Sequence, residues 1–245
     1  DLAVRLAARD LEVAGQHGAG QRHDHDVTSD EVACAADDAA HARAVALDRD
    51  GPFLRAIAGR ARRHGCYIVI NVSLRQGGGD LTVSSLLYDT AGRLVAGADK
   101  QSLMGHENTW FARAQSTSDV IATPFGRLAM FPCRDGVTCE TPRGLALRGA
   151  QVFCDSLNSF ALDEASLHVP ARASENKVFL VAANKVGPLI PGELLQAVSE
   201  QTHIPLRYLH GAGESQIVSP AGEILARGPR EGEAVVFAEI DLSLA

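Results

Sequence analysis

The chain of 245 residues is 46% hydrophobic and 22% charged, which is typical of a globular protein with a sizeable core, so we expect a single domain over residues 1–245. Its net charge of −7 and its pI near 5.7 argue against a nucleic-acid-binding protein. No apolar run approaches the length needed to cross a bilayer, which argues against a membrane protein.

The N-terminal segment carries weak signals. Residues 2–13 alternate imperfectly and could form a strand. They lack the basic-then-apolar layout of a signal peptide, so a cytoplasmic location is the default expectation. His23 and His25 are each followed by an aspartate and invite a metal-site interpretation, but spacing fixes no third ligand. A solvated loop is the favoured interpretation of this tract.

The cysteines number five, at positions 34, 66, 133, 139 and 154. This odd set has no paired CxxC spacing, so neither a disulfide framework nor a zinc cluster is indicated. We expect reduced thiols.

A regular alternation of helices and strands is predicted after Asp50. The predicted elements are helices over 54–63 and about 165–176, and strands over 67–71, 81–89, 94–98 and 178–183, with a further strand at Phe153. The strand over 94–98 brings Lys100 to a strand end. The pattern favours the α/β class with mixed sheets.

The stretch from Gly126 to Asn158 is the most informative part of the chain. An apolar run over 128–131 predicts a buried strand, and Pro132 breaks it just before Cys133. A turn follows, and residues 140–148 predict a helix, for which Asp135 and Glu140 are expected to act as caps. This order suits a nucleophile facing backbone N–H groups at a helix start. A lone cysteine is more often a small buried hydrophobe, so these residues alone leave both interpretations open.

Several short motifs occur in a fixed order around this stretch. They are Asp89-Thr-Ala-Gly92, Lys100-x-x-Leu103-x-x-x-Glu107-x-x-Trp110-Phe111, Thr123-Pro-Phe-Gly126, Cys133-Arg-Asp135-Gly-Val-Thr-Cys-Glu140, Ala171-Arg-Ala-x-Glu175-Asn176, Val181-Ala-Ala-Asn184 and Gly213-x-Ser215-x-Ile217. As an ordered set they resemble the nitrilase, or carbon-nitrogen hydrolase, superfamily, in the variant found among its amidases. The resemblance covers roughly residues 50–245 and is poor before residue 50. It implies a four-layer αββα sandwich with two mixed β-sheets. The poor match near the N-terminus, where the family has a long amphipathic helix, indicates that the N-terminal strand and helix region is shortened in this chain.

The resemblance also implies a Glu-Lys-Cys catalytic triad. Cys133 and Lys100 match the nucleophile and the lysine. Counting back from Asp50 places the glutamate at Glu31, although its flanks lack the family's apolar strand and proline. Glu31 could equally lie in the first turn of a helix over 31–46, and Asp30 is the only substitute that a strand shifted by one residue would offer.

Other site residues follow from the same resemblance. Glu107 matches a glutamate that braces the lysine and the substrate, and the backbone N–H of Arg134 is expected to stabilise the oxyanion. Asn158 and Phe160 fall where family members build the substrate pocket, although this segment also reads as a plain loop. The resemblance implies no metal and no cofactor. It implies a homodimer or a higher homo-oligomer.

Two classes of function stay open. The first is a thiol amidohydrolase that cleaves a small amide or N-carbamoyl compound through a cysteine thioester and releases ammonia. The second is a catalytically weak or inactive relative that serves as a binding or assembly subunit, which the poorly matched N-terminus favours. The matches at Lys100, Glu107 and Cys133 favour the enzyme, and those after Cys133 favour an amidase over a nitrilase.

Overall fold

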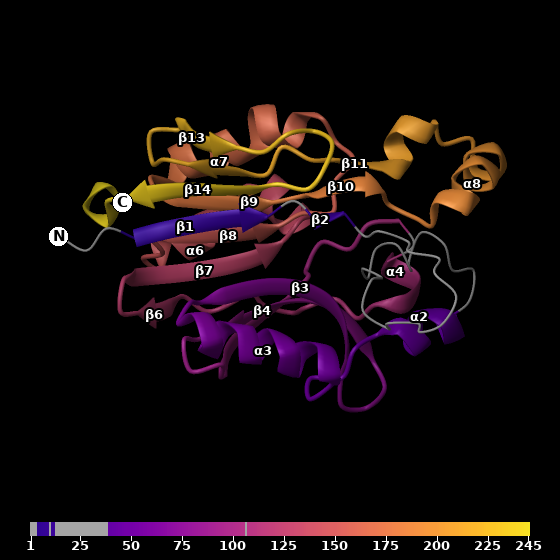
Figure 1. The fold of residues 1–245 in the computed structure, drawn as a ribbon, viewed down its shortest axis with the longest axis horizontal. Helices are drawn as coiled ribbons and strands as arrows, with labels where there is room; N and C mark the ends of the chain where they lie inside the picture. The colour runs from indigo at the N-terminus through magenta and orange to yellow at the C-terminus, as the bar shows by residue number, and fades with distance from the viewer. Residues whose placement is uncertain (1–3, 10, 13–38, 106) are drawn as a thin grey trace.

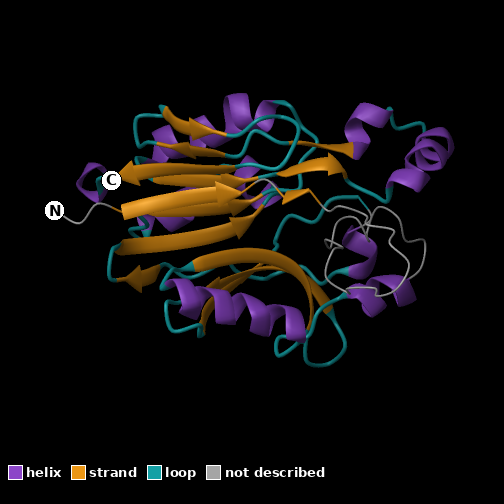
Figure 2. Ribbon diagram, viewed as in Figure 1, coloured by secondary structure: helices purple, strands orange, loops and turns teal. Residues whose placement is uncertain are grey.

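The structure is a computed structural model that describes residues 4–9, 11, 12, 39–105 and 107–245. Within these ranges two β layers are packed face to face, with helices on their outer sides (Figures 1 and 2). In the part of the chain that the structure describes, we find no helix with both the length and the apolar character that a membrane crossing requires.

A six-stranded mixed sheet forms one of the two β layers. Its strands, in spatial order, are β13 (Ile224–Arg227), β12 (Gln216–Val218), β9 (Phe179–Ala183), β8 (Val152–Ser156), β7 (Gly126–Pro132) and β6 (Ile121–Thr123). β7, β8 and β9 are parallel, and the other pairs are antiparallel. The carboxyl ends of three parallel strands therefore meet at one edge, and Cys133 directly follows β7 at that edge.

Helices cover one face of this sheet. They are α5 (Arg134–Val137), α6 (Glu140–Leu147), a π-helical turn η1 (Glu164–His168) and α7 (Val169–Asn176). Phe131 and Phe153 project from the sheet toward Leu145 and Ala173 of the helices, and all four side chains are buried. The two rings meet edge to face with centroids 5.4 Å apart, an arrangement that aromatic pairs prefer. This packing fixes α5 and α6 directly behind Cys133.

Two antiparallel ladders make up the second β layer. One contains β3 (Ile68–Arg75), β4 (Leu81–Tyr88) and β5 (Leu94–Asp99), and the other contains β1 (Val4–Arg9) and β14 (Val235–Ile240). The first ladder packs Leu87 and Ala98 against Met130 of β7. The second packs Ile240 against Val181. Among the described residues no strand joins the two ladders.

The outer face of the first ladder is covered by α3 (Pro52–His64), which packs Leu54 against Leu74 and Leu86. The helix begins at Pro52, whose fixed φ and missing N–H are tolerated in a first turn. It ends at Gly65, which adopts a left-handed φ of 60° that glycine accepts without strain. The predicted helix over 54–63 is thus present, extended slightly at both ends.

The remaining elements flank these layers. They are β2 (Leu11–Glu12), α2 (Ala39–Val45), α4 (Glu107–Trp110), β10 (Lys185–Pro188), η2 (Gly192–Leu194), α8 (Leu195–Thr202), η3 (Leu206–Leu209), β11 (His210–Ala212) and η4 (Leu242–Leu244). β10 pairs with β11 and β2 in a small sheet. Figure 1 shows α4 and α8 on the side of the molecule toward which β7 runs.

The predicted αββα sandwich is confirmed. The predicted shortening of the N-terminal region falls on residues 13–38, outside the described ranges. The first half of the predicted helix over 31–46 also falls there, and the structure describes α2 within its second half. One boundary was wrong: β3 was expected to end at Asn71 but continues to Arg75. Asn71 and Ser73 look like loop residues, yet they pair with Ser85 and Val83 of β4, and Asn71 Nδ2 donates to Ser85 Oγ at 3.1 Å.

Candidate active site

Lys100 lies just beyond the end of β5, where the chain still follows β4. Its backbone N–H donates to the Val83 carbonyl at 2.8 Å, and its own carbonyl accepts from Ala114 at 3.0 Å. These bonds fix the backbone on both sides of the residue. Only 2% of the lysine is exposed, so a cationic side chain is held inside the protein.

Glu107, the first residue of α4, forms an ion pair with the buried lysine. Its Oε1 lies 2.5 Å from Lys100 Nζ, and its Oε2 accepts the backbone N–H of Met104 at 2.6 Å. The second bond closes the turn that begins α4, as a glutamate at a helix start often does. A buried ion pair needs such additional hydrogen bonds to offset the desolvation of both charges. Lys100 is therefore held with its charge in a defined place.

Cys133 occupies a strained turn between β7 and α5. Its φ of 48° and ψ of −106° lie outside the regions that residues with a Cβ favour, and such strain is found mainly at functional sites. The Cys133 carbonyl accepts from Gly136 N at 2.8 Å, and its N–H donates to Asp155 Oδ1 at 3.0 Å. The side chain is half-buried. A thiol is thus presented at a rigid point on the carboxyl edge of the sheet.

Asp135 ties the segment that carries Lys100 to the segment that carries Cys133. Its Oδ2 accepts the N–H of Gln101 at 2.9 Å, and its Oδ1 accepts the N–H of Ser102 at 2.7 Å. The carboxylate is buried, with 1% exposed. The sequence predicts a helix cap here, but the hydrogen bonds of Asp135 cross to another segment instead.

Arg172 supports α5 from α7. Its Nε donates to the Gly136 carbonyl at 3.1 Å, and its Nη2 donates to the Val137 carbonyl at 3.0 Å. A guanidinium supplies these donors in one planar group, so it can satisfy two carbonyls at the end of a four-residue helix.

The other predicted site residues lie as follows. Arg134 is exposed and is the first residue of α5. Asn158 is half-buried, and its Oδ1 is buried with no hydrogen-bond partner in the described structure. Phe160 is 39% exposed and meets the Tyr208 ring edge to face with centroids 5.7 Å apart. Glu31 and Asp30 lie outside the described residues.

A polar network fixes the loop that carries Asn158 and Phe160. The N–H of Ser159 donates to Asn184 Oδ1 at 2.9 Å, and Asn184 Nδ2 donates to the Gly213 carbonyl at 2.9 Å. The backbone N–H of Asn184 donates to Ser215 Oγ at 2.8 Å. Three segments that are distant in sequence are thereby joined beside the carboxyl ends of β8 and β9.

Two buried carboxyl groups near Cys133 are not among the site residues that the sequence predicts. Asp155 of β8 is 5% exposed and Glu164 of η1 is 6% exposed. Burial, together with the carboxylate of Glu164, holds the pKa of Asp155 well above its usual range. The hydrogen bond from the Cys133 N–H lowers this pKa but does not outweigh them. Burial also raises the pKa of Glu164. Two weaker effects lower it, namely the nearby His168 and a hydrogen bond from Ser159 Oγ at 3.3 Å. The available signal was an acidic residue inside an apolar strand, Val152-Phe-Cys-Asp155.

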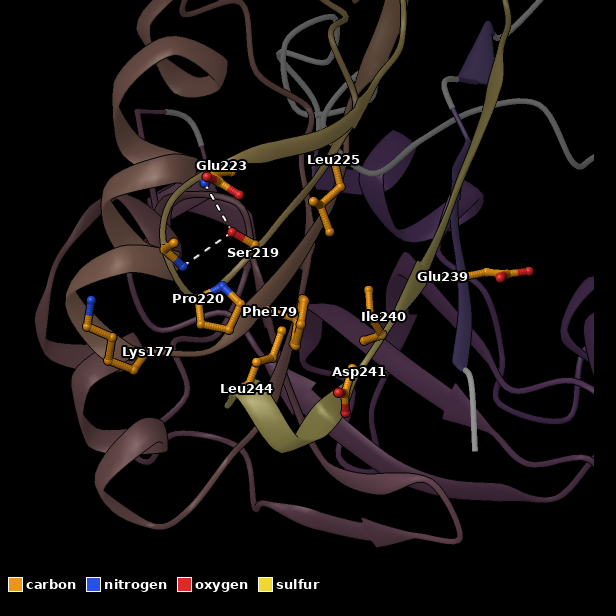
Figure 3. A pocket seen from close by; sticks show the side chains of 11 residues that line it. Lys177, Phe179, Ser219, Pro220, Glu223, Leu225, Glu239, Ile240, Asp241 and Leu244 are labelled. Atoms are coloured by element: carbon orange, nitrogen blue, oxygen red, sulfur yellow. Dashed lines mark hydrogen bonds between the residues drawn. The ribbon is translucent and has the colours of Figure 1, made fainter. Parts of the chain in front are cut away.

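A pocket of about 560 Å³ lies elsewhere (Figure 3). Phe179, Ser219, Leu225, Ile240 and Leu244 are among its lining residues. Phe179 begins β9, whereas Cys133 follows the end of the parallel strand β7, so the pocket and the thiol lie at opposite ends of the sheet. The pocket is therefore separate from the candidate site. Within the described ranges, no group of three or more His, Cys, Asp or Glu residues is arranged to hold a metal ion.

A cysteine on a strained strand-to-helix turn, at the carboxyl edge of an αββα sandwich and near a buried lysine–glutamate pair, is typical of a thiol hydrolase. The family model described as carbon-nitrogen hydrolase matches residues 30–245. The chain belongs to this family.

Curated relatives that resemble the chain are nitrilases. A nitrilase of Pyrococcus abyssi is 30% identical over 184 residues, which are 75% of this chain and 63% of the relative. A bifunctional nitrilase/nitrile hydratase of Lupinus angustifolius is 28% identical over 205 residues, which are 80% of this chain and 57% of the relative. The chain thus spans about 57% to 63% of the length of these two relatives.

Solved structures that resemble the chain include an amidase. The amidase of Nesterenkonia sp. superposes with a TM-score of 0.66 at 24% identity, covering 86% of this chain and 72% of the amidase. A cysteine-to-alanine mutant of that amidase in complex with butyramide gives a TM-score of 0.65 at 23% identity, covering 87% and 72%. At this identity the likeness establishes the shared fold.

Proposed function

We propose that the protein is a thiol amidohydrolase that cleaves the C–N bond of a small linear amide or N-carbamoyl compound and releases ammonia. The observation that carries the proposal is the Asp135 bridge, which joins the segment of the buried Lys100–Glu107 pair to the strained turn of Cys133. An amide needs a strong nucleophile, a stabilised oxyanion and a proton for its leaving group. These three needs assign roles to the residues.

In the first half of the proposed reaction, Cys133 Sγ attacks the amide carbon while Glu31 takes the thiol proton. The carbonyl oxygen becomes an oxyanion, which the Lys100 ammonium and the N–H of Arg134 stabilise. The C–N bond then breaks, and the nitrogen leaves as ammonia with the proton that Glu31 returns. An acyl thioester on Cys133 results.

In the second half, water attacks the thioester carbon and Glu31 accepts a proton from it. The C–S bond breaks, the thiol recovers a proton, and the carboxylic acid leaves. Glu107 holds Lys100 in place throughout. Asn158 would accept a hydrogen bond from a substrate N–H, a role that its buried and unpartnered Oδ1 supports. Phe160 would form the apolar wall of the substrate pocket with its ring.

A nitrile is the second candidate substrate, because the two curated relatives described above are named nitrilases. Addition of the Cys133 thiol across C≡N gives a thioimidate, from which water releases ammonia and leaves the same thioester. The two candidates therefore share the nucleophile and differ in the first electrophile.

The test is ammonia release from a matched panel that pairs each small linear amide with its N-carbamoyl analogue and the corresponding nitrile. We expect turnover of amides by the wild type, none by Cys133→Ala, and an acyl adduct on Cys133 by mass spectrometry during turnover. Turnover of nitriles alone would favour the second candidate. No ammonia and no adduct with any compound would favour the catalytically weak binding subunit.

We also propose a homo-oligomer, which the family resemblance leads us to expect, and a location in the cytoplasm. Light scattering on the purified protein tests the first point. A monomer at all concentrations would contradict it.

A further inference from the structure

Asp155 is an acidic side chain placed in the middle of an apolar core. It lies on β8, a central strand, with Phe131 opposite it on β7 and Ala182 opposite it on β9. Because strand residues two apart face the same way, Asp155 shares the face of Phe153, which the helices cover. A buried carboxyl group carries a large desolvation cost if it is charged, so its retention there calls for an explanation.

The carboxyl oxygens of Asp155 face the turn that carries the thiol. Oδ1 accepts the N–H of Cys133 at 3.0 Å. A side chain at Gly136 would bring its Cβ within 2.5 Å of Oδ2, so the carboxyl group lies directly beneath α5. Cys133 adopts its left-handed φ of 48° at this point, and a backbone in that region persists only where its surroundings hold it. Asp155 is one of the groups that hold it.

The titratable groups around Asp155 come from four segments of the chain. Glu164 faces it from η1, Asp135 from α5, Lys100 from beyond β5, and Cys154 is its neighbour on β8. The two carboxylates and burial favour the protonated form of Asp155, and the Lys100 ammonium and the Cys133 N–H oppose it less strongly. A protonated carboxyl can still accept a hydrogen bond, so the contact with Cys133 is kept without a negative charge.

We propose that Asp155 is a positioning residue for Cys133 that acts as a neutral carboxylic acid, holding the strained backbone without placing a negative charge beside the sulfur. The proposal rests on the proposed function only in taking Cys133 as the nucleophile. A negative charge at Asp155 would disfavour both the thiolate and the oxyanion. Activity therefore depends on the proton that Asp155 carries.

The experiment compares wild type, Asp155→Asn and Asp155→Ala by the rate at which iodoacetamide modifies Cys133 from neutral to alkaline pH. Peptide mass spectrometry follows each thiol, and exposed Cys66 in the same molecule corrects for reagent and pH. Asparagine mimics the neutral acid. We expect its Cys133 rate to equal that of wild type within about twofold at neutral pH and to exceed it increasingly as pH rises, where Asp155 ionises in wild type only.

Asp155→Ala removes the acceptor altogether. We expect kcat for ammonia release to fall by about tenfold to a hundredfold at every pH with KM little changed, because the nucleophile is misplaced. Asp89→Asn is the matched control. It alters another buried aspartate, which accepts the N–H groups of Ala91 and Arg93 in the β4–β5 turn, and should leave the Cys133 profile unchanged.

Three results would overturn the proposal. They are a constant ratio of Asn-variant to wild-type rates across pH, a large loss of Cys133 reactivity in Asp155→Asn at neutral pH, or an unchanged kcat in Asp155→Ala. If a variant fails to fold by circular dichroism, the wild-type profile decides alone. Ionisation of Asp155 should spread the rise of the Cys133 rate with pH over two steps, so a rise that follows a single pKa contradicts the proposal. Alkylation needs no substrate, so the proposed function can fail on every amide while this test still gives an answer.

Discussion

The N–H of Gln101 donates to Asp135 Oδ2 at 2.9 Å, so the residue after Lys100 is fastened to the residue two beyond Cys133. The adjacent bond from Ser102 makes the attachment bidentate. The lysine and the thiol come from opposite β layers, and this carboxylate spans the distance between them. Its removal should loosen the site more than the fold.

We expect Asp135→Ala to lower the free energy of unfolding by about 1–3 kcal/mol, because two half-buried backbone N–H groups lose their buried acceptor. The rate of ammonia release should fall by about a hundredfold through misplacement of Lys100 relative to Cys133. Urea denaturation and steady-state kinetics measure the two effects. Asp119→Ala, at an exposed position, is the control. A variant that loses stability but keeps its rate would show that the bridge does not position the site.

Substitution of Lys100 should show that turnover depends on its ammonium group and not only on a positive charge at this position. Lys100→Ala should reduce turnover by at least about two orders of magnitude, the scale for losing one oxyanion stabiliser. Lys100→Arg should also fail, because a planar guanidinium cannot replace a compact ammonium. Near-normal rates in both variants would remove the lysine from the mechanism.

The stability of the Lys100–Glu107 pair gives a further prediction. Loss of either buried partner should cost about 3–5 kcal/mol, whereas Lys100→Met combined with Glu107→Gln should recover part of that loss and none of the activity. Chemical denaturation of both single variants and the double variant measures this coupling. Additive losses would show that the pair contributes little.

The cysteines should react in a fixed order. Burial raises the pKa of the Cys154 thiol to about 12, with the neighbouring Asp155 adding to the effect, so this thiol stays protonated at ordinary pH. We expect iodoacetamide to modify Cys133 first, the exposed Cys66 and Cys139 next, and Cys154 last. Peptide mass spectrometry over time checks the order. If Cys139→Ala loses activity and Cys133→Ala does not, Cys133 is not the nucleophile.

Protonation of Glu164 should make stability depend on pH. Burial raises its pKa in the folded protein, so from about pH 4.3, the ordinary glutamate value, up to the folded pKa the folded state holds a proton that the unfolded state has released. Stability contributed by this group is therefore lost as pH rises through that window. Glu164→Gln should raise Tm at neutral pH, and the gain should disappear below about pH 4. Glu200→Gln, at an exposed site, should give no such trend.

The sequence predicted the elements that carry the site better than the contacts that hold it. Pro132 ends an apolar run and places Cys133 at a strand end, and residues 94–98 bring Lys100 to another, because both signals are local. The bonds from Asp135 to Gln101 and from Asp155 to Cys133 join distant segments, and no spacing rule reveals them. The helix α8 was missed although Leu194, Leu195 and Val198 recur at helical spacing.

The pairing of β1 with β14 sets an order of events in folding. Val4 lies opposite Ile240, so this ladder joins nearly the whole length of the chain. Loop-closure entropy makes such contacts slow to form, whereas β3, β4 and β5 are linked by short turns. During synthesis β1 must wait until β14 has left the ribosome. The face of the six-stranded sheet that contains Val181 and Ile217 is therefore covered late, and chaperones have their longest opportunity to bind there.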